Sequence, residues 1–251
     1  MAGHSKWANI RHRKAVVDAR RAKLFTRLAR EITIAARLGG GDPEANPRLR
    51  LAIENARAEN MPMENIRRAI QRGTGEIQGE QLEEVLYEGY GPFGVALLIE
   101  VATDNRNRTV SLLRSTLNRL GGSLGESGSV LWNFERKGVI TVDAQGISED
   151  ELLEHVLEVG ADDYIRGEGS YIIYCAPDRL AQCQRALQER GVQVQQAKLE
   201  YLPKSTVRIE SREQAERLLK FLETLEDLDD VQNVYSNFEM DDALMESLQH
   251  A

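Results

Sequence analysis

The sequence predicts an α+β fold in which a helical N-terminal domain is followed by two ferredoxin-like α/β domains, one inserted in the other. Three observations support this prediction. Up to about residue 75, apolar residues recur at helical spacing between glycine and proline breaks. From about residue 82 the pattern changes to short runs typical of strands. Residues 138–203 then contain a complete βαββαβ set, the order of a ferredoxin-like domain.

The helical domain is predicted over residues 1–79. From Val17 onward the apolar residues of the first helix form one stripe, and the sequence 39–43 (GGGDP) ends it. Asn46 and Pro47 suit the N-cap and first position of a second helix, which runs to about Glu59. Pro62 begins a third, short helix, which Gly73 and Gly75 end.

The next segment, residues 80–137, is predicted as ββαβ. Strands at 85–90 and 95–101 flank a glycine-proline turn, which is a hairpin pattern. A helix follows at 108–120, and a glycine-rich loop leads to a strand at 130–134, in which Trp132 is expected to be buried. Such a layer still lacks one helix and one strand.

An insertion explains the missing elements. The predicted inserted domain, 138–203, has strands at 139–142, 163–165, 171–175 and 192–201, and helices at 148–159 and 178–190. After Pro203 the chain continues with a strand at 207–209, a helix at 211–225 and a strand at 231–238. We therefore expect one discontinuous domain, 80–137 with 204–240, interrupted by 138–203. Residues 241–251 are expected to be a frayed tail.

Charge divides the 251-residue chain in two. Residues 1–75 contain 16 Lys and Arg against 7 Asp and Glu, a net of +9, whereas residues 76–251 contain 16 against 33, a net of −17. The overall charge of −8 therefore conceals a basic head on an acidic body. A polyanion would be repelled by the body and attracted by the head.

The basic residues of the head favour nucleic acid as the partner. At 100° per residue, Arg20, Lys23, Arg27, Arg30 and Arg37 share one side of the first helix, away from its apolar stripe. Arginine suits phosphate because its guanidinium group holds two oxygens at once. The alternative is an ordinary solvated charged face. The candidate nucleic-acid-binding residues of the head are Lys6, Trp7, Arg11, His12, Arg13, Lys14, Arg20, Arg21, Lys23, Arg27, Arg30 and Arg37.

A second candidate contact lies at residues 104–109 (DNRNRT), where a strand is expected to give way to a helix. Free amides and the helix dipole at such a point favour an anion. Asn105, Arg106, Asn107 and Arg108 are therefore candidate nucleic-acid-binding residues. The alternative is an Asx turn and helix cap whose arginines pair with carboxylates of the body.

Other motifs give no site. The segment 89–94 (GYGPFG) satisfies GxGxxG, but it lies between two strands and is interpreted as a hairpin turn. The GxxG in 121–125 has no basic residue and is interpreted as a loop. The four histidines do not cluster with Cys175 or Cys183, and nucleophile and Walker motifs are lacking. We therefore expect no enzyme activity, no cofactor and no metal.

The cellular setting follows from the same composition. Two cysteines do not indicate a disulfide framework, which favours a reducing cytoplasm. No apolar run approaches the ~20 residues of a membrane-spanning helix, and the N-terminus lacks the apolar core and cleavage site of a secretory signal. A cytoplasmic protein without membrane contact is expected.

Four segments closely resemble the YebC/PmpR family, which is related to mitochondrial translational activators. These are MAGHSKWANIRHRKAVVDARRAK, GGGDPEANPRLRLAIENARAENMP, YEGYGPFGVALLIEVATDNRNRTVS and FERKGVI. They span most of residues 1–138. The sequence departs from the family at Phe93, where members usually carry a second glycine. The resemblance implies a helical head with two α/β domains and a cytoplasmic, non-enzymatic regulator.

Three functions are therefore considered. The first, which matches the usual family label, is a DNA-binding transcriptional regulator, although no helix with base-reading residues stands out. The second is a translation factor that binds ribosomal RNA on the ribosome, as other family members do. The third is a protein-binding adaptor whose arginines meet an acidic partner.

Overall fold

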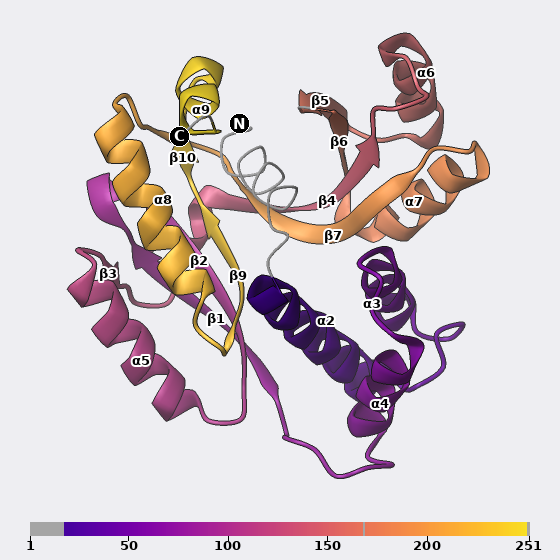
Figure 1. Cartoon of the computed structure of the whole chain (residues 1–251), viewed down its shortest axis with the longest axis horizontal. Helices are drawn as coiled ribbons and strands as arrows, with labels where there is room; N and C mark the ends of the chain where they lie inside the picture. The colour runs from indigo at the N-terminus through magenta and orange to yellow at the C-terminus, as the bar shows by residue number, and fades with distance from the viewer. Residues whose placement is uncertain (1–17, 168, 250–251) are drawn as a thin grey trace. The chain divides into compact units, whose positions relative to one another are not determined.

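The computed structural model describes residues 18–167 and 169–249, and their chain path forms two compact units (Figure 1). The head unit contains residues 18–80 and Arg136–Glu200. The hairpin unit contains Gln81–Glu135 and residues 201–249. The chain passes between them inside strands β4 (Phe134–Asp143) and β7 (Val194–Pro203). The predicted division into three domains and a tail remains a prediction.

The head unit begins with three helices, α2 (Asp18–Gly39), α3 (Pro47–Ala58) and α4 (Met63–Thr74). They pack together because each buries one apolar stripe. The core of this bundle consists of Ile32, Ala35, Ala36, Leu49, Ala52, Ile53, Ala56, Met61, Ile66 and Ala69. The three helices expected from the sequence are confirmed, and Val17 lies outside the described residues.

Asn46 joins the end of α2 to the start of α3. Its side-chain oxygen accepts the Leu49 amide at 3.1 Å, as a helix N-cap does. Its side-chain nitrogen donates to the carbonyls of Ala35, at 2.8 Å, and Gly40, at 2.9 Å. Asn46 is buried, so one amide group satisfies three backbone groups at the junction of the two helices.

Gly73 has a different role from the one predicted. The sequence suggested that it ends α4, but α4 continues through it and ends at the left-handed Gly75. A Cβ at Gly73 would lie 2.3 Å from the Thr33 carbonyl oxygen and 2.7 Å from the Ala36 Cβ. Glycine is therefore needed there because α4 crosses α2 at very close range.

The head unit also contains a four-stranded sheet with two helices. In chain order its elements are β4, α6 (Glu149–Val159), β5 (Asp163–Gly167), β6 (Ser170–Cys175), α7 (Leu180–Glu189) and β7, and the strand order is β5-β6-β4-β7. The helix expected at 178–190 begins later, at Leu180, because Pro177–Arg179 form a separate 3-10 turn before α7. Cys175 and Cys183 are both free and buried in this core, and burial raises the pKa of Cys175 to about 12.

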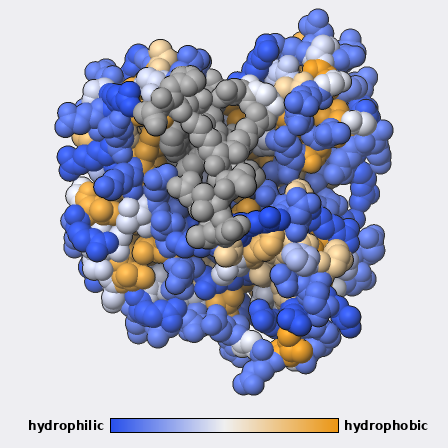
Figure 2. All heavy atoms as spheres, in the orientation of Figure 1, coloured by the Kyte–Doolittle hydropathy of each residue, from blue (hydrophilic) through white to orange (hydrophobic). Residues whose placement is uncertain are grey.

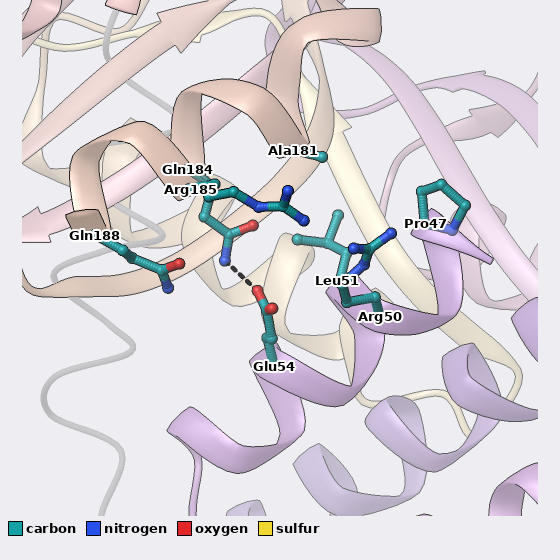
Figure 3. A pocket seen from close by; sticks show the side chains of 8 residues that line it. All are labelled: Pro47, Arg50, Leu51, Glu54, Ala181, Gln184, Arg185 and Gln188. Atoms are coloured by element: carbon teal, nitrogen blue, oxygen red, sulfur yellow. Dashed lines mark hydrogen bonds between the residues drawn. The ribbon is translucent and has the colours of Figure 1, made fainter. Parts of the chain in front are cut away.

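Within the head unit, α3 packs against α7 and β7. The Asn55 side chain accepts the Ala197 amide at 3.2 Å and donates to the Ala197 carbonyl at 2.8 Å. Because β7 is an edge strand of its sheet, Asn55 satisfies backbone groups that would otherwise be open. Nearby, Gln184 donates to Glu54 at 2.7 Å, at a shallow pocket between α3 and α7 (Figure 3).

The hairpin unit is built on the antiparallel pair β1 (Glu83–Tyr90) and β2 (Ala96–Thr103), in a sheet with order β3-β1-β2-β9. The short β3 (Ser123–Leu124) and β9 (Val231–Ser236) complete it. Alternate β2 residues such as Leu97 and Ile99 pack against α5 (Arg106–Arg119) and α8 (Arg212–Glu226), which cover the same face (Figure 1). The mixed α+β architecture with N-terminal helices is thus confirmed.

The strand predicted at 130–134 was wrong. Leu131–Asn133 form a 3-10 turn, β4 begins only at Phe134, and the fourth strand of the sheet is β3, inside the glycine-rich loop. Trp132 was expected to be buried, yet it is 68% exposed. Val130 and Phe134 are buried, and the chain between them turns outward because the Glu88 carboxylate binds its amides.

The C-terminal elements also differ from expectation. The strand predicted at 207–209 is β8 (Val207–Arg208), which pairs with β10 (Phe238–Glu239) in a separate parallel ladder and does not join the four-stranded sheet. The frayed tail expected at 241–251 is wrong for its described part, because α9 (Asp242–Gln249) is a helix. Met245 buries itself in the core beside α8, which gives this helix its tertiary support.

The turn between β1 and β2 confirms the hairpin interpretation of 89–94. Pro92–Gly94 form a 3-10 turn, in which Phe93 has φ of 64°, a left-handed conformation that glycine adopts more easily. The Arg217 guanidinium lies 5.6 Å from the Phe93 ring centroid. Phe93 therefore adopts a strained backbone, as a residue with a side chain does in the left-handed region.

Glu88 is a buried carboxylate that organises the loop after β3. It accepts the backbone amides of Gly128, Val130, at 2.7 Å, and Leu131, at 2.8 Å. Burial raises the pKa of Glu88, whereas the hydrogen bonds from the three amides lower it. Together the amides outweigh burial, so the pKa lies below the ordinary value of 4.5.

We predict that Glu88→Gln lowers the free energy of unfolding at pH 7 by about 2–3 kcal/mol, because charge-assisted hydrogen bonds are lost. A depressed folded pKa stabilises the protein above the ordinary carboxyl pKa, and this stabilisation disappears as the pH falls through the folded value. Chemical unfolding at pH 7 and pH 3.5 should therefore show a smaller acid-induced loss in the variant. An identical acid-induced loss in the two proteins would contradict the assignment.

Candidate nucleic-acid interface

The face of α2 opposite the helical core carries a run of cations. Ile32, Ala35 and Ala36 are buried on one side, whereas Lys23 and Arg37 are exposed on the other, where only Ile34 is buried among the described residues. Arg27 and Arg30 lie on the same side as Lys23 and are partly exposed. These four, Lys23, Arg27, Arg30 and Arg37, are called the basic face of α2. Arg20 shares its helical position, but its side chain lies outside the described residues.

The N-terminal half of α2 is less buried than its C-terminal half. Between Arg21 and Glu31 the described residues are exposed or half-buried, and full burial begins at Ile32. The Arg21 guanidinium lies 5.5 Å from the Phe25 ring centroid, one turn along the helix. Arg21 therefore adds an exposed cation on another side of this half of the helix.

Two carboxylates of the helical bundle pair with arginines outside the basic face of α2. Glu31 of α2 accepts Arg48 of α3 at 2.9 Å, and Glu64 accepts Arg68 within α4 at 3.2 Å. Arg67 and Arg72 add two exposed cations on α4. Neutralisation of Glu31 by α3 leaves the charge of α2 strongly positive, as phosphate binding requires.

Several predicted contact residues lie outside the described residues. They are Lys6, Trp7, Arg11, His12, Arg13 and Lys14. Of the remaining head residues, α2 brings together Arg20, Arg21, Lys23, Arg27, Arg30 and Arg37. Their binding role remains a prediction.

The second predicted contact has the geometry of a helix cap. Asn105 is the N-cap of α5, and its side-chain oxygen accepts the Arg108 amide at 3.0 Å. The Arg108 guanidinium donates to Asp104 at 2.8 Å and to the buried Asp230 at 3.1 Å. Asp230, foremost, and Asp104 raise the pKa of Arg108. Arg108 is thus tied to the hairpin unit, as the alternative interpretation expected.

The other two residues of this segment are more available. Arg106 is exposed and lies 3.7 Å from Glu83, a loose ion pair. Asn107 is exposed as well. Binding of nucleic acid at Asn105–Arg108 therefore remains a prediction that depends mainly on Arg106 and Asn107.

A metal centre and a membrane-spanning helix are two other kinds of site to consider in the described part of the chain. In residues 18–167 and 169–249, His, Cys, Asp and Glu form no group of three that could hold a metal ion. None of the helices described is both long and apolar enough to cross a membrane. On the face drawn in Figure 2 hydrophilic residues predominate, and the hydrophobic ones lie in small separate patches.

Comparison with known proteins places this α+β chain, with its helical head, in a family. Residues 5–76 match the model of the TACO1/YebC protein N-terminal domain, and residues 82–238 match that of the TACO1/YebC second and third domain. The chain therefore belongs to the TACO1/YebC family, as the sequence resemblance indicated.

Similar proteins extend over the full length. A probable transcriptional regulatory protein of Petrotoga mobilis is 56% identical over 99% of this chain and 98% of its own. One of Aquifex aeolicus is 52% identical over 99% of this chain and 100% of its own. The crystal structure of a conserved hypothetical protein from Aquifex aeolicus, 53% identical, superposes with a TM-score of 0.85 over 91% of this chain and 94% of that one.

Proposed function

We propose that this protein is a non-enzymatic regulator of gene expression that binds nucleic acid through the basic face of α2. The carrying observation is the arrangement of Lys23, Arg27, Arg30 and Arg37 on one side of a helix whose other side is buried. Like charges at helical spacing repel one another, so such a face gains from a partner that supplies negative charge. The names of the relatives, probable transcriptional regulatory proteins, support the regulatory role.

The composition of α2 favours phosphate contacts over base reading. Its 22 residues contain no Asn or Gln, the side chains that read adenine in the major groove. Arg and Lys can also contact guanine, but the larger share of protein–DNA hydrogen bonds goes to phosphate and sugar, and such contacts orient the protein. We propose a DNA-binding transcriptional regulator, in line with the relatives' names. Ribosomal RNA is the second candidate target, because backbone recognition serves a folded RNA equally well.

Three further assignments accompany this proposal. Residues 138–203 are proposed as a ferredoxin-like domain inserted in another α/β domain, supported by the βαββαβ order and the strand order β5-β6-β4-β7. Asn105–Arg108 are proposed as a second contact. A cytoplasmic location is supported by two buried free cysteines.

The proposal is tested by salt-dependent binding of the full chain to a DNA duplex and to a ribosomal RNA fragment. We expect the logarithm of the association constant to fall linearly with the logarithm of salt concentration. Four to six phosphate contacts would give a slope of about −3 to −5. A slope near zero with both nucleic acids would instead favour the protein-binding adaptor. The nucleic acid bound more tightly at equal salt identifies the target class.

A further inference from the structure

Two aromatic side chains of the hairpin unit are exposed although their polar atoms are bound. Trp132 is 68% exposed and Tyr90 39%. The Trp132 indole nitrogen donates to the Ser129 carbonyl at 3.0 Å, and the Tyr90 hydroxyl donates to the same carbonyl at 3.4 Å. One carbonyl oxygen thus anchors both rings, and their faces remain open to solvent.

The turn that carries Trp132 is held from two sides. On one side the buried Glu88 accepts the amides of Val130 and Leu131. On the other, the Asn133 side-chain oxygen accepts the amide and hydroxyl of Ser205 at 2.9 and 2.7 Å, and its nitrogen donates to the Ser205 carbonyl at 3.1 Å. Trp132 is therefore an exposed aromatic on an ordered support. A rigid aromatic side chain loses little conformational entropy on contact with a flat partner.

A cation lies at the backbone of Trp132. The Lys204 ammonium donates to the Trp132 carbonyl at 3.1 Å, and it is an exposed residue. An ammonium group has three donors, so two remain for another acceptor. Glu126 and Glu135 are the exposed carboxylates of the same stretch. With one lysine against two glutamates, attraction of phosphate is weak here and the ring must provide most of the binding energy.

We propose that Trp132, Tyr90 and Lys204 form a site for single-stranded nucleic acid. An unpaired base stacks on the Trp132 ring beside Tyr90, and Lys204 binds an adjacent phosphate. Stacking on aromatic side chains with a nearby cation is the general mode of single-strand binding. In a duplex the base faces are covered, so the site selects unpaired segments. This inference rests on the proposed function and adds a second site, in the other unit from the basic face of α2.

Fluorescence of Trp132 itself reports on the site. The chain has two tryptophans, so quenching that occurs in the unaltered chain and not in Trp132→Phe is assigned to Trp132. The full chain is titrated with a 12-nucleotide oligouridylate, a 12-nucleotide oligothymidylate and a 12-base-pair duplex. We expect saturable quenching by the single strands and little by the duplex. The RNA and DNA arms show which sugar the site prefers. No quenching by either single strand would overturn the proposal.

Variants are compared by anisotropy with labelled single strands. Trp132→Ala should weaken binding about 5- to 100-fold, because one stacked base is lost. Trp132→Phe retains a ring and should lose less. The matched control is Leu157→Ala, since Leu157 of α6 is also 68% exposed and should be neutral. Far-ultraviolet circular dichroism establishes that each variant is folded.

The outcomes separate this site from the proposed function. Normal binding by Trp132→Ala, with loss of binding when the basic face of α2 is reversed, would overturn the aromatic site alone and leave Trp132 as a contact for protein. Failure of the unaltered chain to bind any nucleic acid would contradict both. Loss in Trp132→Ala for single strands but not for the duplex is the result expected.

Discussion

Reversing three charges on the basic face of α2, Lys23→Glu, Arg27→Glu and Arg30→Glu together, is expected to weaken nucleic-acid binding by at least about 100-fold at ~100 mM salt. Each lost phosphate contact removes about 0.9 from the slope of the logarithmic salt plot for a DNA duplex, so the slope should flatten by about 2 to 3. The carboxylates also repel the phosphates. Filter binding or anisotropy across a range of salt concentrations measures both quantities.

A matched control has the same net charge as the α2 variant. Arg166, Arg185 and Arg208 are exposed arginines outside α2, and changing all three to glutamate alters the charge by the same amount. If attraction is local to α2, this control should lose much less affinity than the α2 variant. Equal losses in the two proteins would show that overall charge, and not the basic face, governs binding. Both variants should retain the helix content of the unaltered chain.

Asn46→Ala is expected to have the largest effect on stability, a decrease of about 3–5 kcal/mol in the free energy of unfolding. The N-cap of α3 is lost, at about 1 kcal/mol. The buried carbonyl of Ala35 and the partly buried carbonyl of Gly40 lose the Asn46 donor, and an unsatisfied buried group costs about 1–3 kcal/mol. Because Asn46 joins α2 to α3, the basic face should become less ordered as well. Urea unfolding followed by circular dichroism measures the change.

Asn46→Asp separates the effect of the N-cap on α3 from that of the bridge, the two hydrogen bonds that Asn46 donates to the Ala35 and Gly40 carbonyls. A carboxylate can still accept the Leu49 amide, but it cannot donate to Ala35 and Gly40, and it places negative charge beside two carbonyl oxygens. We therefore expect Asn46→Asp to be strongly destabilised as well. Stability close to that of the unaltered chain would mean that the cap alone matters and that the bridge to α2 contributes little.

Local patterns in the sequence predicted the head well. Asn46 and Pro47 mark the start of α3 because capping and proline position depend on neighbouring residues alone. The apolar stripe of α2 was also predictable, since helical periodicity specifies which side is buried. The hairpin at 89–94 followed from its glycine-proline turn. Each of these features is encoded within a few residues.

Features that depend on distant residues were not predictable. Alternation at 130–134 fits a strand, but Glu88, about forty residues earlier, binds the amides there and turns Trp132 outward. The pairing of Arg108 with Asp230 spans more than a hundred residues, so the cap and the binding interpretations of 104–109 had equal support. Gly125 and Gly128, just before the predicted strand, were a local signal of a loop in this region.

The same limitation explains the C-terminal helix and the close helix crossing. Residues 242–249 form a short acidic helix, which is supported by the packing of Leu244, Met245 and Leu248 against the core of the hairpin unit. The sequence around Gly73 predicts the end of a helix. In the structure Gly73 lies inside α4, where the missing side chain allows close contact with the backbone of α2. Tertiary packing decided both outcomes.

Ultraviolet crosslinking in growing cells, followed by sequencing of the attached nucleic acid, tests the central claim most directly. The unaltered chain is compared with the variant reversed at Lys23, Arg27 and Arg30. We predict specific crosslinks that the variant loses, at promoter DNA if the protein is a transcriptional regulator and at ribosomal RNA if it acts in translation. Equal crosslinking by the two proteins, or none above background, would contradict nucleic-acid binding through the basic face of α2.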